Sequence, residues 1–119
     1  MDFSGIWHYI PYLLKGLQAT VLLSMGALTT SLILGIILMV VGRSRFSFVR
    51  TSARIYTELI LGVPVLVLVY IIFFVFPDFG IRLSPVVAGL LALTLYYAPY
   101  MAEAIRGAVN SISKGQIEA

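Results

Sequence analysis

Long apolar stretches dominate the pattern of hydrophobic and polar positions along this chain. The residues from Gly16 to Gly42 carry no charge, and neither do those from Leu83 to Ala102. Between these two stretches, Ile55 to Phe76 holds a single charge, Glu58, near its start. An α-helix needs about 20 mainly apolar residues to cross a bilayer, and each stretch meets that length. The pattern therefore predicts an all-α, polytopic membrane protein with three transmembrane helices.

Composition supports a membrane location. Hydrophobic residues make up 61% of the chain and charged residues 11%, and the mean hydropathy is +1.03. These values lie outside the usual range for soluble domains, and a chain of this size has too little interior to hide so much apolar surface. A closed β-barrel would need short segments that alternate strictly, a pattern that this sequence lacks. With no cysteine in the chain, a disulfide framework is also excluded.

The basic residues between the first two stretches indicate the orientation of the chain. This loop contains no acidic residue, and its positive charges are Arg43, Arg45, Arg50 and Arg54. The positive-inside rule places such a loop in the cytoplasm. The N-terminus and the turn from Pro77 to Ser84 are then outside, and the C-terminal tail is inside. The net charge of +3 thus reflects membrane topology and not nucleic-acid binding.

Residues 1–15 precede the first stretch and have a different character. They contain Trp7, Tyr9 and Tyr12, and no Lys or Arg comes before Lys15. Aromatic residues gather where a membrane meets water, so we expect a short helix at the outer, periplasmic interface. The segment lacks the positive start of a signal peptide, and the apolar run after it is too long for one. His8 is expected to lie among headgroups and is given no role.

Two carboxylates lie at or near membrane depth, where an ionisable group normally has a partner or faces a polar path. Arg54 precedes Glu58 by four residues, and Arg106 follows Glu103 by three. Both spacings bring side chains together on a helix. Two interpretations stay open. The pairs anchor helix ends, or the carboxylates line a transport pathway.

Prolines and small residues predict the shapes and contacts of the helices. Pro64 and Pro99 each remove a backbone donor, so each is expected to kink its helix or begin an unwound segment. Gly80 belongs to a turn before the third stretch. Small and hydroxylated residues allow membrane helices to pack closely. Among those of the first stretch are Thr20, Ser24, Thr29, Thr30 and Ser31, beside Gly26 and Gly35.

One face of the third stretch combines aromatic, acidic and small residues. Tyr96, Tyr100, Glu103 and Gly107 follow the i, i+4, i+7, i+11 spacing of a helix face. A polar interior and an aromatic belt at a helix end explain this face equally well. The sequence has no nucleophile and base in a catalytic pattern, no phosphate-binding loop, and one His. We therefore predict neither an enzyme nor a metal or cofactor bound by this chain.

The tail carries the most specific motif of the sequence. It reads Ala102-Glu103-Ala104-Ile105-Arg106-Gly107, then Ser111-Ile112, then Gly115-Gln116-Ile117-Glu118-Ala119. This motif resembles the approach to the cytoplasmic EAA loop of ABC importer permeases, and more closely their polar amino-acid uptake branch. Upstream positions agree with the same family, so the resemblance covers nearly the whole chain. These positions are Leu14-Lys15-Gly16, Thr20, Tyr56, Glu58, Gly62 and Pro64.

The resemblance implies a function and a set of partners. Residues 16–119 would belong to a permease domain of the ABC transmembrane type 1, cut at the start of the EAA loop. Such a permease pairs with a second, identical or different permease and receives amino acids from a periplasmic or lipid-anchored solute-binding protein. ATP and Mg are bound by a separate ABC ATPase, and the subunit lies in the inner membrane.

The resemblance also suggests roles for individual residues. The ATPase-coupling residues would be Gly115, Gln116, Glu118 and Ala119, with Gly115 ending the third helix. Together with the polar positions described above, the resemblance suggests a substrate pathway. That pathway comprises Tyr56, Glu58, Gly62, Pro64, Tyr100 and Glu103, with Arg54 and Arg106 in helix-end ion pairs.

The sequence departs from the family's motif at one position, and one alternative function stays open. Leu61-Gly62-Val63-Pro64 stands where the family commonly has Arg-Gly-Thr-Pro. The missing arginine leaves the identity of the transported amino acid open. The alternative function is a small three-span membrane protein that binds and regulates a larger complex without transporting anything. A reading frame that continues past Ala119 into further spans favours the permease.

Overall fold

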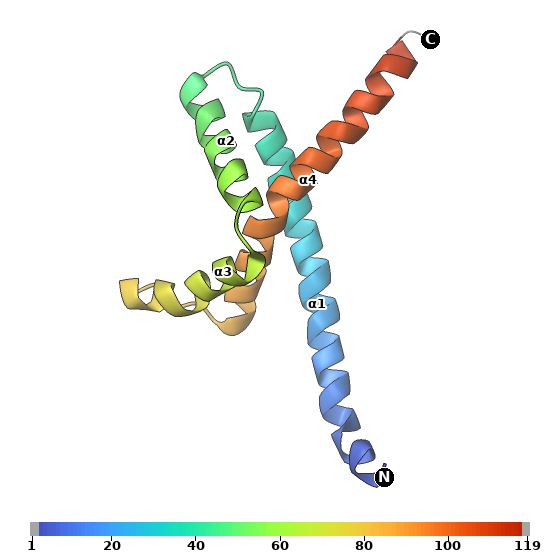
Figure 1. The fold of residues 1–119 in the computed structure, drawn as a ribbon. Helices are drawn as coiled ribbons and strands as arrows, with labels where there is room; N and C mark the ends of the chain where they lie inside the picture. Colours follow the sequence, from blue (N-terminus) through green and yellow to red (C-terminus); the bar gives the residue numbers. More distant parts are fainter. Residues whose placement is uncertain (1–2, 118–119) are drawn as a thin grey trace.

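The computed structural model describes residues 3–117, with side chains described as far as Ile112. Its elements are all helical in this range, as the hydrophobic pattern predicts. In chain order they are α1 (Ser4–Val41), α2 (Ser47–Leu61), α3 (Val65–Tyr70), the π-helical η1 (Ile71–Val75), the 3-10 helix η2 (Phe76–Phe79) and α4 (Pro85–Ile117). Figure 1 shows α4 crossing α1, with α2 and α3 on one side of the crossing.

Two helices of the described chain, α1 and α4, are each long and apolar enough to cross a membrane. The middle stretch counts as a third span only if α2 and the helix after it form one broken span, because the two parts are bent by 106°. The stretch from Ile55 to Phe76 is thus interrupted, in agreement with the kink or unwound segment expected at Pro64. The structure supports two spans, or three if the bent pair is one.

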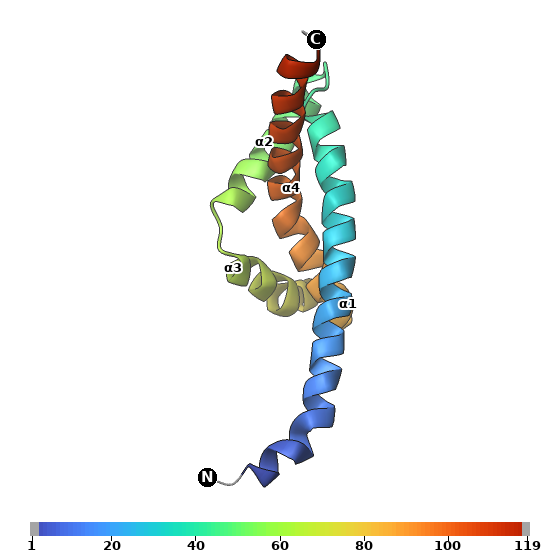
Figure 2. The same ribbon diagram turned by 90° about the vertical axis from the view of Figure 1, so that its right-hand side faces the viewer.

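The break between α2 and α3 occurs at Gly62–Pro64, where a proline stops the helical hydrogen bonds. Pro64 has extended backbone angles, φ −64° and ψ 144°. It has no N–H to donate, and its ring disfavours a helical conformation in the residue before it. The expected kink at Pro64 is thus confirmed. Figure 2 shows the chain leaving α2 and turning sharply into α3.

At its N-terminus, α1 differs from the expectation of a separate short helix. It runs from Ser4 to Val41 without a break, and Pro11 lies inside it. Figure 2 shows that α1 bends toward its N-terminal end, as a proline inside a helix tends to cause. Residues 4–15 are therefore continuous in structure with the first span. Their location at the membrane interface stays a prediction.

Small residues form the contact between α1 and α4. Ala27, Ser31 and Gly35 recur every four residues on one face of α1, and all three are buried. A Cβ added at Gly35 would lie 2.8 Å from Cβ of Met101 and 3.1 Å from the carbonyl oxygen of Ala98. The two backbones therefore meet at the closest approach that a glycine permits.

Hydroxyl groups add a polar link to this contact. The hydroxyls of Thr30 and Thr94 lie 2.6 Å apart across the two helices, and the Thr30 hydroxyl also donates to the Gly26 carbonyl. A hydroxyl has one proton, so Thr94 is then the donor between the helices. Thr20 and Thr29 instead donate to carbonyls of their own helix. The prediction of close packing thus holds for only part of the small and hydroxylated set.

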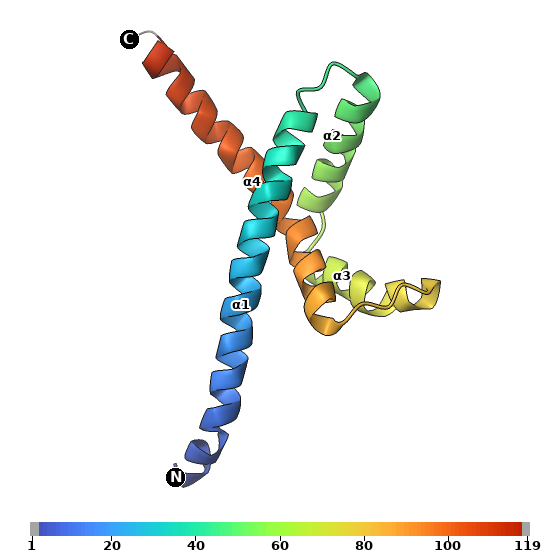
Figure 3. The same ribbon diagram turned by 180° about the vertical axis from the view of Figure 1, so that it is seen from behind.

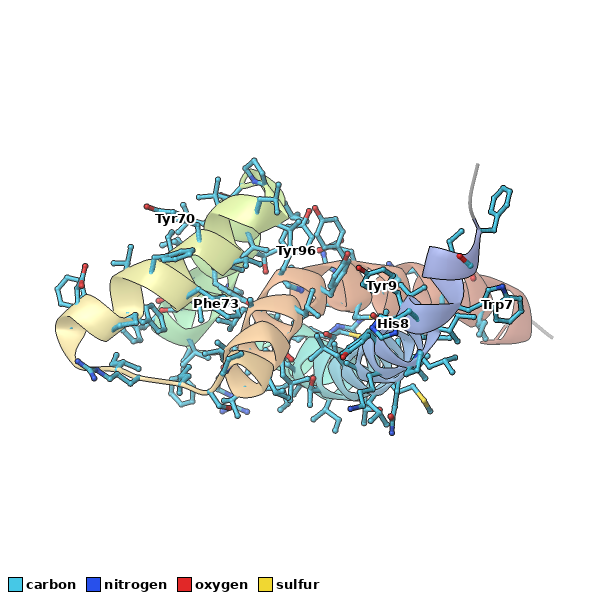
Figure 4. The ribbon with its side chains drawn as sticks, turned by 90° about the horizontal axis from the view of Figure 1, so that it is seen from below. Trp7, His8, Tyr9, Tyr70, Phe73 and Tyr96 are labelled. Carbon is cyan, nitrogen blue, oxygen red and sulfur yellow. The ribbon has the colours of Figure 1, made fainter. Side chains whose placement is uncertain are left out.

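A second apolar cluster joins the helices after the break to the first half of α4. Ile72 of η1 is buried against Ala88 and Ala92 of α4, and Phe73 packs against the same cluster. Figure 4 shows Phe73 between these two elements, while Tyr70 points away from α4. The break at Pro64 therefore lets the chain fold back onto α4. A left-handed Gly80, at φ 83°, then closes the turn toward α4, as the sequence predicts.

The third helix extends beyond the apolar stretch that predicts it and changes direction along its length. It continues past Ala102 to Ile117 and contains Pro99 in its interior. Figure 3 shows α4 bending near its crossing with α1, which agrees with the predicted kink. The expectation that Gly115 ends this helix is wrong. A glycine costs a helix only about 1 kcal/mol relative to alanine, which is too little to stop a helix by itself.

The Gly35 contact leads to a stability prediction. Gly35→Ala is expected to destabilise the full-length protein by about 1–3 kcal/mol, because the added methyl group overpacks the helix crossing. Gly16→Ala is the matched control, since a Cβ there meets nothing within 4 Å. It should be neutral or slightly stabilising. Thermal unfolding in detergent measures both variants, and equal stability would contradict the close approach of α1 to α4.

Candidate functional site

A groove of about 460 Å³ lies between the end of α1, one face of α2 and the middle of α4. We call it the charged groove, after the ionic side chains in its lining. These are Arg50, Arg54 and Glu58 from α2, and Glu103 and Arg106 from α4. The three from α2 share a face because they are spaced at i, i+4 and i+8. The groove thus joins charges that are about 50 residues apart in the sequence, with three positive groups and two negative ones.

Each carboxylate in the charged groove lies next to an arginine of its own helix. Nη2 of Arg106 is 2.7 Å from Oε1 of Glu103, and Nε of Arg54 is 3.9 Å from Oε1 of Glu58. The side chains of Arg54 and Glu58 are 79% and 72% exposed, and those of Arg106 and Glu103 are 52% and 46% exposed. Exposed pairs of this kind contribute only about 0–1 kcal/mol to stability. Their charges therefore remain available to groups that enter the groove.

Arg50 makes a different contact from the other two arginines. Its Nη1 donates to the carbonyl oxygen of Ser44 at 3.3 Å, which ties α2 to the turn after α1. The sequence places Arg50 and Arg54 in a loop, but α2 begins at Ser47 and includes both. Two of the four basic residues thus have positions set by a helix, while Arg43 and Arg45 lie in the connecting segment.

Tyr56 connects α2 to α4. Its hydroxyl donates a hydrogen bond to the backbone carbonyl of Leu95, and the side chain is partly buried. Leu95 lies four residues before Pro99, so no helical N–H is available to this carbonyl. The sequence suggests a substrate pathway role for Tyr56. In the structure its hydroxyl is hydrogen-bonded to the backbone of the neighbouring helix, α4. Gly62 and Pro64, of the same suggested pathway, form the break between α2 and α3.

A group of three phenols precedes Glu103 on α4. The hydroxyls of Tyr96 and Tyr100 are 3.3 Å apart. The ring of Tyr97 meets that of Tyr96 edge-on, with 5.0 Å between their centroids. Tyr97 and Tyr100 are 43% and 40% exposed in this chain. Figure 4 shows Tyr96 projecting from α4. Both interpretations of this face, a polar interior and an aromatic belt, therefore stay open.

The suggested ATPase-coupling residues lie at the far end of α4. Gly115 and Gln116 belong to its last turns, whereas Glu118 and Ala119 lie outside the described residues. Figure 1 shows this end of α4 extending beyond the other helices.

The N-terminal end of α1 carries the single histidine. The ring of His8 meets that of Tyr9 edge-on at 5.6 Å, and Figure 4 shows Trp7 projecting from the same end of α1, apart from both. Within residues 3–117, no three or more His, Asp or Glu side chains group together as metal ligands would. The chemistry that the described residues offer is thus ionic and hydrogen-bonding, and it concentrates in the charged groove.

Sequence reasoning missed three features of this region. They are the contact between Tyr56 and Leu95, the hydroxyl pair of Thr30 and Thr94, and the presence of Arg50 in the groove. One signal was available, because Pro99 leaves a carbonyl that needs a donor. The donor itself lies 39 residues away from Leu95, and helical spacing cannot identify it.

Two long apolar helices, a helix pair bent at a proline and a groove lined by charges place the chain in the class of polytopic membrane proteins. Residues 31–119 match the family described as binding-protein-dependent transport system inner membrane component. The chain belongs to this family. The resemblance found in the tail is thereby confirmed.

The most similar proteins include several amino-acid permeases. The probable amino-acid ABC transporter permease protein YckA of Bacillus subtilis (strain 168) is 35% identical over 95% of this chain and 54% of its own length. The arginine transport system permease protein ArtQ of the same organism is 35% identical over 100% of this chain and 55% of its own length. The chain thus spans about half the length of the curated relatives it matches.

A solved structure agrees with the fold. The crystal structure of an amino acid ABC transporter with histidines superposes with a TM-score of 0.91 at 30% identity. The match covers 99% of this chain and 55% of that one. The break at Pro64 and the crossing of α1 and α4 therefore belong to a helix arrangement that an amino-acid transporter also has.

Proposed function

We propose that this chain forms part of the permease subunit of an ABC importer that carries amino acids, most naturally polar ones, across the inner membrane. The observation that carries the proposal is the charged groove, built on a helix arrangement that matches an amino-acid transporter at a TM-score of 0.91. The relatives named above are amino-acid permeases. The alternative of a small regulatory membrane protein finds no support among them.

The proposed partners follow from the family. A binding-protein-dependent system needs a solute-binding protein outside the membrane and an ABC ATPase inside, which holds ATP and Mg. A second permease, identical or different, would complete the translocation path. In this chain, α1, α4 and the broken pair of α2 and α3 would serve as three spans. Residues 1–15 would lie at the periplasmic interface.

For the substrate pathway, we propose the acidic residues of the charged groove and the residues beside it. Glu58 and Glu103 offer carboxylates, and Tyr100 offers a phenol one turn before Glu103. The break at Gly62–Pro64 leaves backbone groups without helical partners, a feature that transporters use near their binding sites. Tyr56 adjoins this path from α2. Leu61, where the family commonly has arginine, leaves the side chain of the amino acid undefined.

The proposed orientation predicts a labelling pattern. In intact cells, a membrane-impermeant thiol reagent should label a cysteine placed at Phe79 and spare one placed at Ser47. The reason is that Ser47 adjoins the basic segment that the positive-inside rule assigns to the cytoplasm. The chain contains no cysteine of its own to confuse the readout. Labelling at Ser47 with protection at Phe79 would reverse the topology.

The proposed pathway predicts different effects of two substitutions at Glu103. In the full-length permease, Glu103→Ala should reduce amino-acid uptake more than Glu103→Gln, because the amide still forms hydrogen bonds after losing the charge. Uptake into proteoliposomes, normalised to permease content, measures both. Since the ion pair is exposed, both variants should keep their thermal stability to within about 1 kcal/mol. Normal uptake by both would leave Glu103 as a helix anchor only.

The proposed coupling role predicts a third result, at Glu118. The carboxylate would meet the ATPase, so Glu118→Lys reverses a charge at a protein interface without touching the lipid-facing surface. Membrane insertion should stay normal, while ATP hydrolysis continues without uptake. Parallel measurements of ATPase rate and uptake in the reconstituted transporter test this. If the two rates fall in proportion, Glu118 does not couple them.

A further inference from the structure

Pro99 creates a specific requirement within α4. Because proline has no N–H, the carbonyl of Leu95, four residues earlier, loses its helical donor, and the ring pushes that carbonyl away from the helix axis. Pro99 is fully buried in the structure, and Leu95 is partly buried. A carbonyl in such surroundings needs another donor.

Tyr56 of α2 supplies that donor. Its hydroxyl is bonded to the Leu95 carbonyl across the helix interface. On the opposite flank, Gly35 of α1 approaches the carbonyl of Ala98, the residue before the proline. The kink in α4 is therefore held from two sides, by a glycine contact with α1 and by a hydrogen bond from α2.

The positions of these residues connect the kink to the charged groove. Tyr56 does not line the groove itself, but it belongs to the same helix as Arg54 and Glu58, which do. Glu103 lies four residues after Pro99, on the part of α4 whose direction the kink sets. Any change in the angle at Pro99 therefore moves Glu103 relative to Glu58.

We propose that Tyr56 is a positioning residue, whose hydroxyl satisfies the carbonyl left free by Pro99 and so fixes the distance between the two walls of the charged groove. It acts through α4 and not by touching the transported molecule. This role rests on the structure of the helices, and it adds to the proposed function a defined hinge and the contact that holds it.

The proposal predicts a dependence between two positions. Pro99→Ala returns an N–H to residue 99, which can then donate to Leu95 within the helix, so the Tyr56 hydroxyl should no longer be needed. Tyr56→Phe alone should lower the maximal uptake rate of the full-length transporter by roughly fivefold, the effect of losing one hydrogen bond. In the Pro99→Ala background, the same substitution should change the rate by less than about twofold.

A distance measurement tests the hinge without relying on transport. Spin labels on cysteines at Ser52 of α2 and Ala104 of α4, both exposed positions, report the separation of the groove walls in the purified full-length protein. Tyr56→Phe should broaden or shift the distance distribution. Adding Tyr56→Phe to Pro99→Ala should leave the distribution of the Pro99→Ala protein unchanged. Tyr70→Phe is the matched control, because Tyr70 is 59% exposed on α3 and should have no effect.

The outcomes separate this role from others. The proposal is supported if Tyr56→Phe broadens the distance distribution in the otherwise unchanged protein but not in the Pro99→Ala protein. This result would hold even if the protein transports nothing. An equal effect of Tyr56→Phe in both backgrounds, or an unchanged distribution, overturns it. A raised KM in both backgrounds also overturns it, because it indicates contact with substrate. If Tyr56→Phe alone fails to fold, recovery of the double variant supports the proposal, and failure of both overturns it.

Discussion

The close contact of α1 and α4 at Gly35 is the constraint on which the rest of the structure depends. A side chain there would meet Met101 and the carbonyl of Ala98 within about 3 Å, so only glycine allows the two backbones to touch. That contact lies beside Pro99 and fixes where α4 crosses α1. The same crossing brings Thr30 and Thr94 to hydrogen-bonding distance. The charged groove then forms where α2 lies against the end of α1 and the middle of α4. In the proposed orientation, this is the cytoplasmic side of the crossing.

Unpaired backbone groups explain the shape of the other elements. In a membrane, a carbonyl without a donor is costly, because lipid offers none. Pro64 withholds the N–H that a continuous helix would offer to the Ile60 carbonyl, and that carbonyl accepts instead from the Val63 N–H at 3.2 Å, in the turn that ends α2. Pro99 withholds its N–H from the Leu95 carbonyl inside α4, and that carbonyl accepts from the Tyr56 hydroxyl of α2. One proline thus ends a helix while the other bends one.

The ion pairs of the charged groove are not the contacts that stabilise the fold. They are well over one-third exposed, so they add little to the folding free energy. The folding contacts are elsewhere, in the small residues of α1 and α4 and in the cluster around Ile72. Charges that do not hold the fold together are available to bind a ligand or to change partners as helices move. That division agrees with the transport role proposed above, in which the helices would rearrange.

The sequence alone determined the helical class and the membrane location, because uninterrupted apolar stretches near 20 residues have few other uses. It also located the break at Pro64, since proline acts on its own backbone, and it identified the family through the spacing of Glu103, Arg106 and the tail glycines. It misjudged the continuity of α1, because the aromatic segment before Lys15 continues into the span, and the end of α4, where Gly115 is too weak to stop a helix. Only the tertiary structure paired Tyr56 with Leu95 and joined α2 to α4 around the groove. Those contacts link distant residues, and they depend on helix crossing angles that no local spacing encodes.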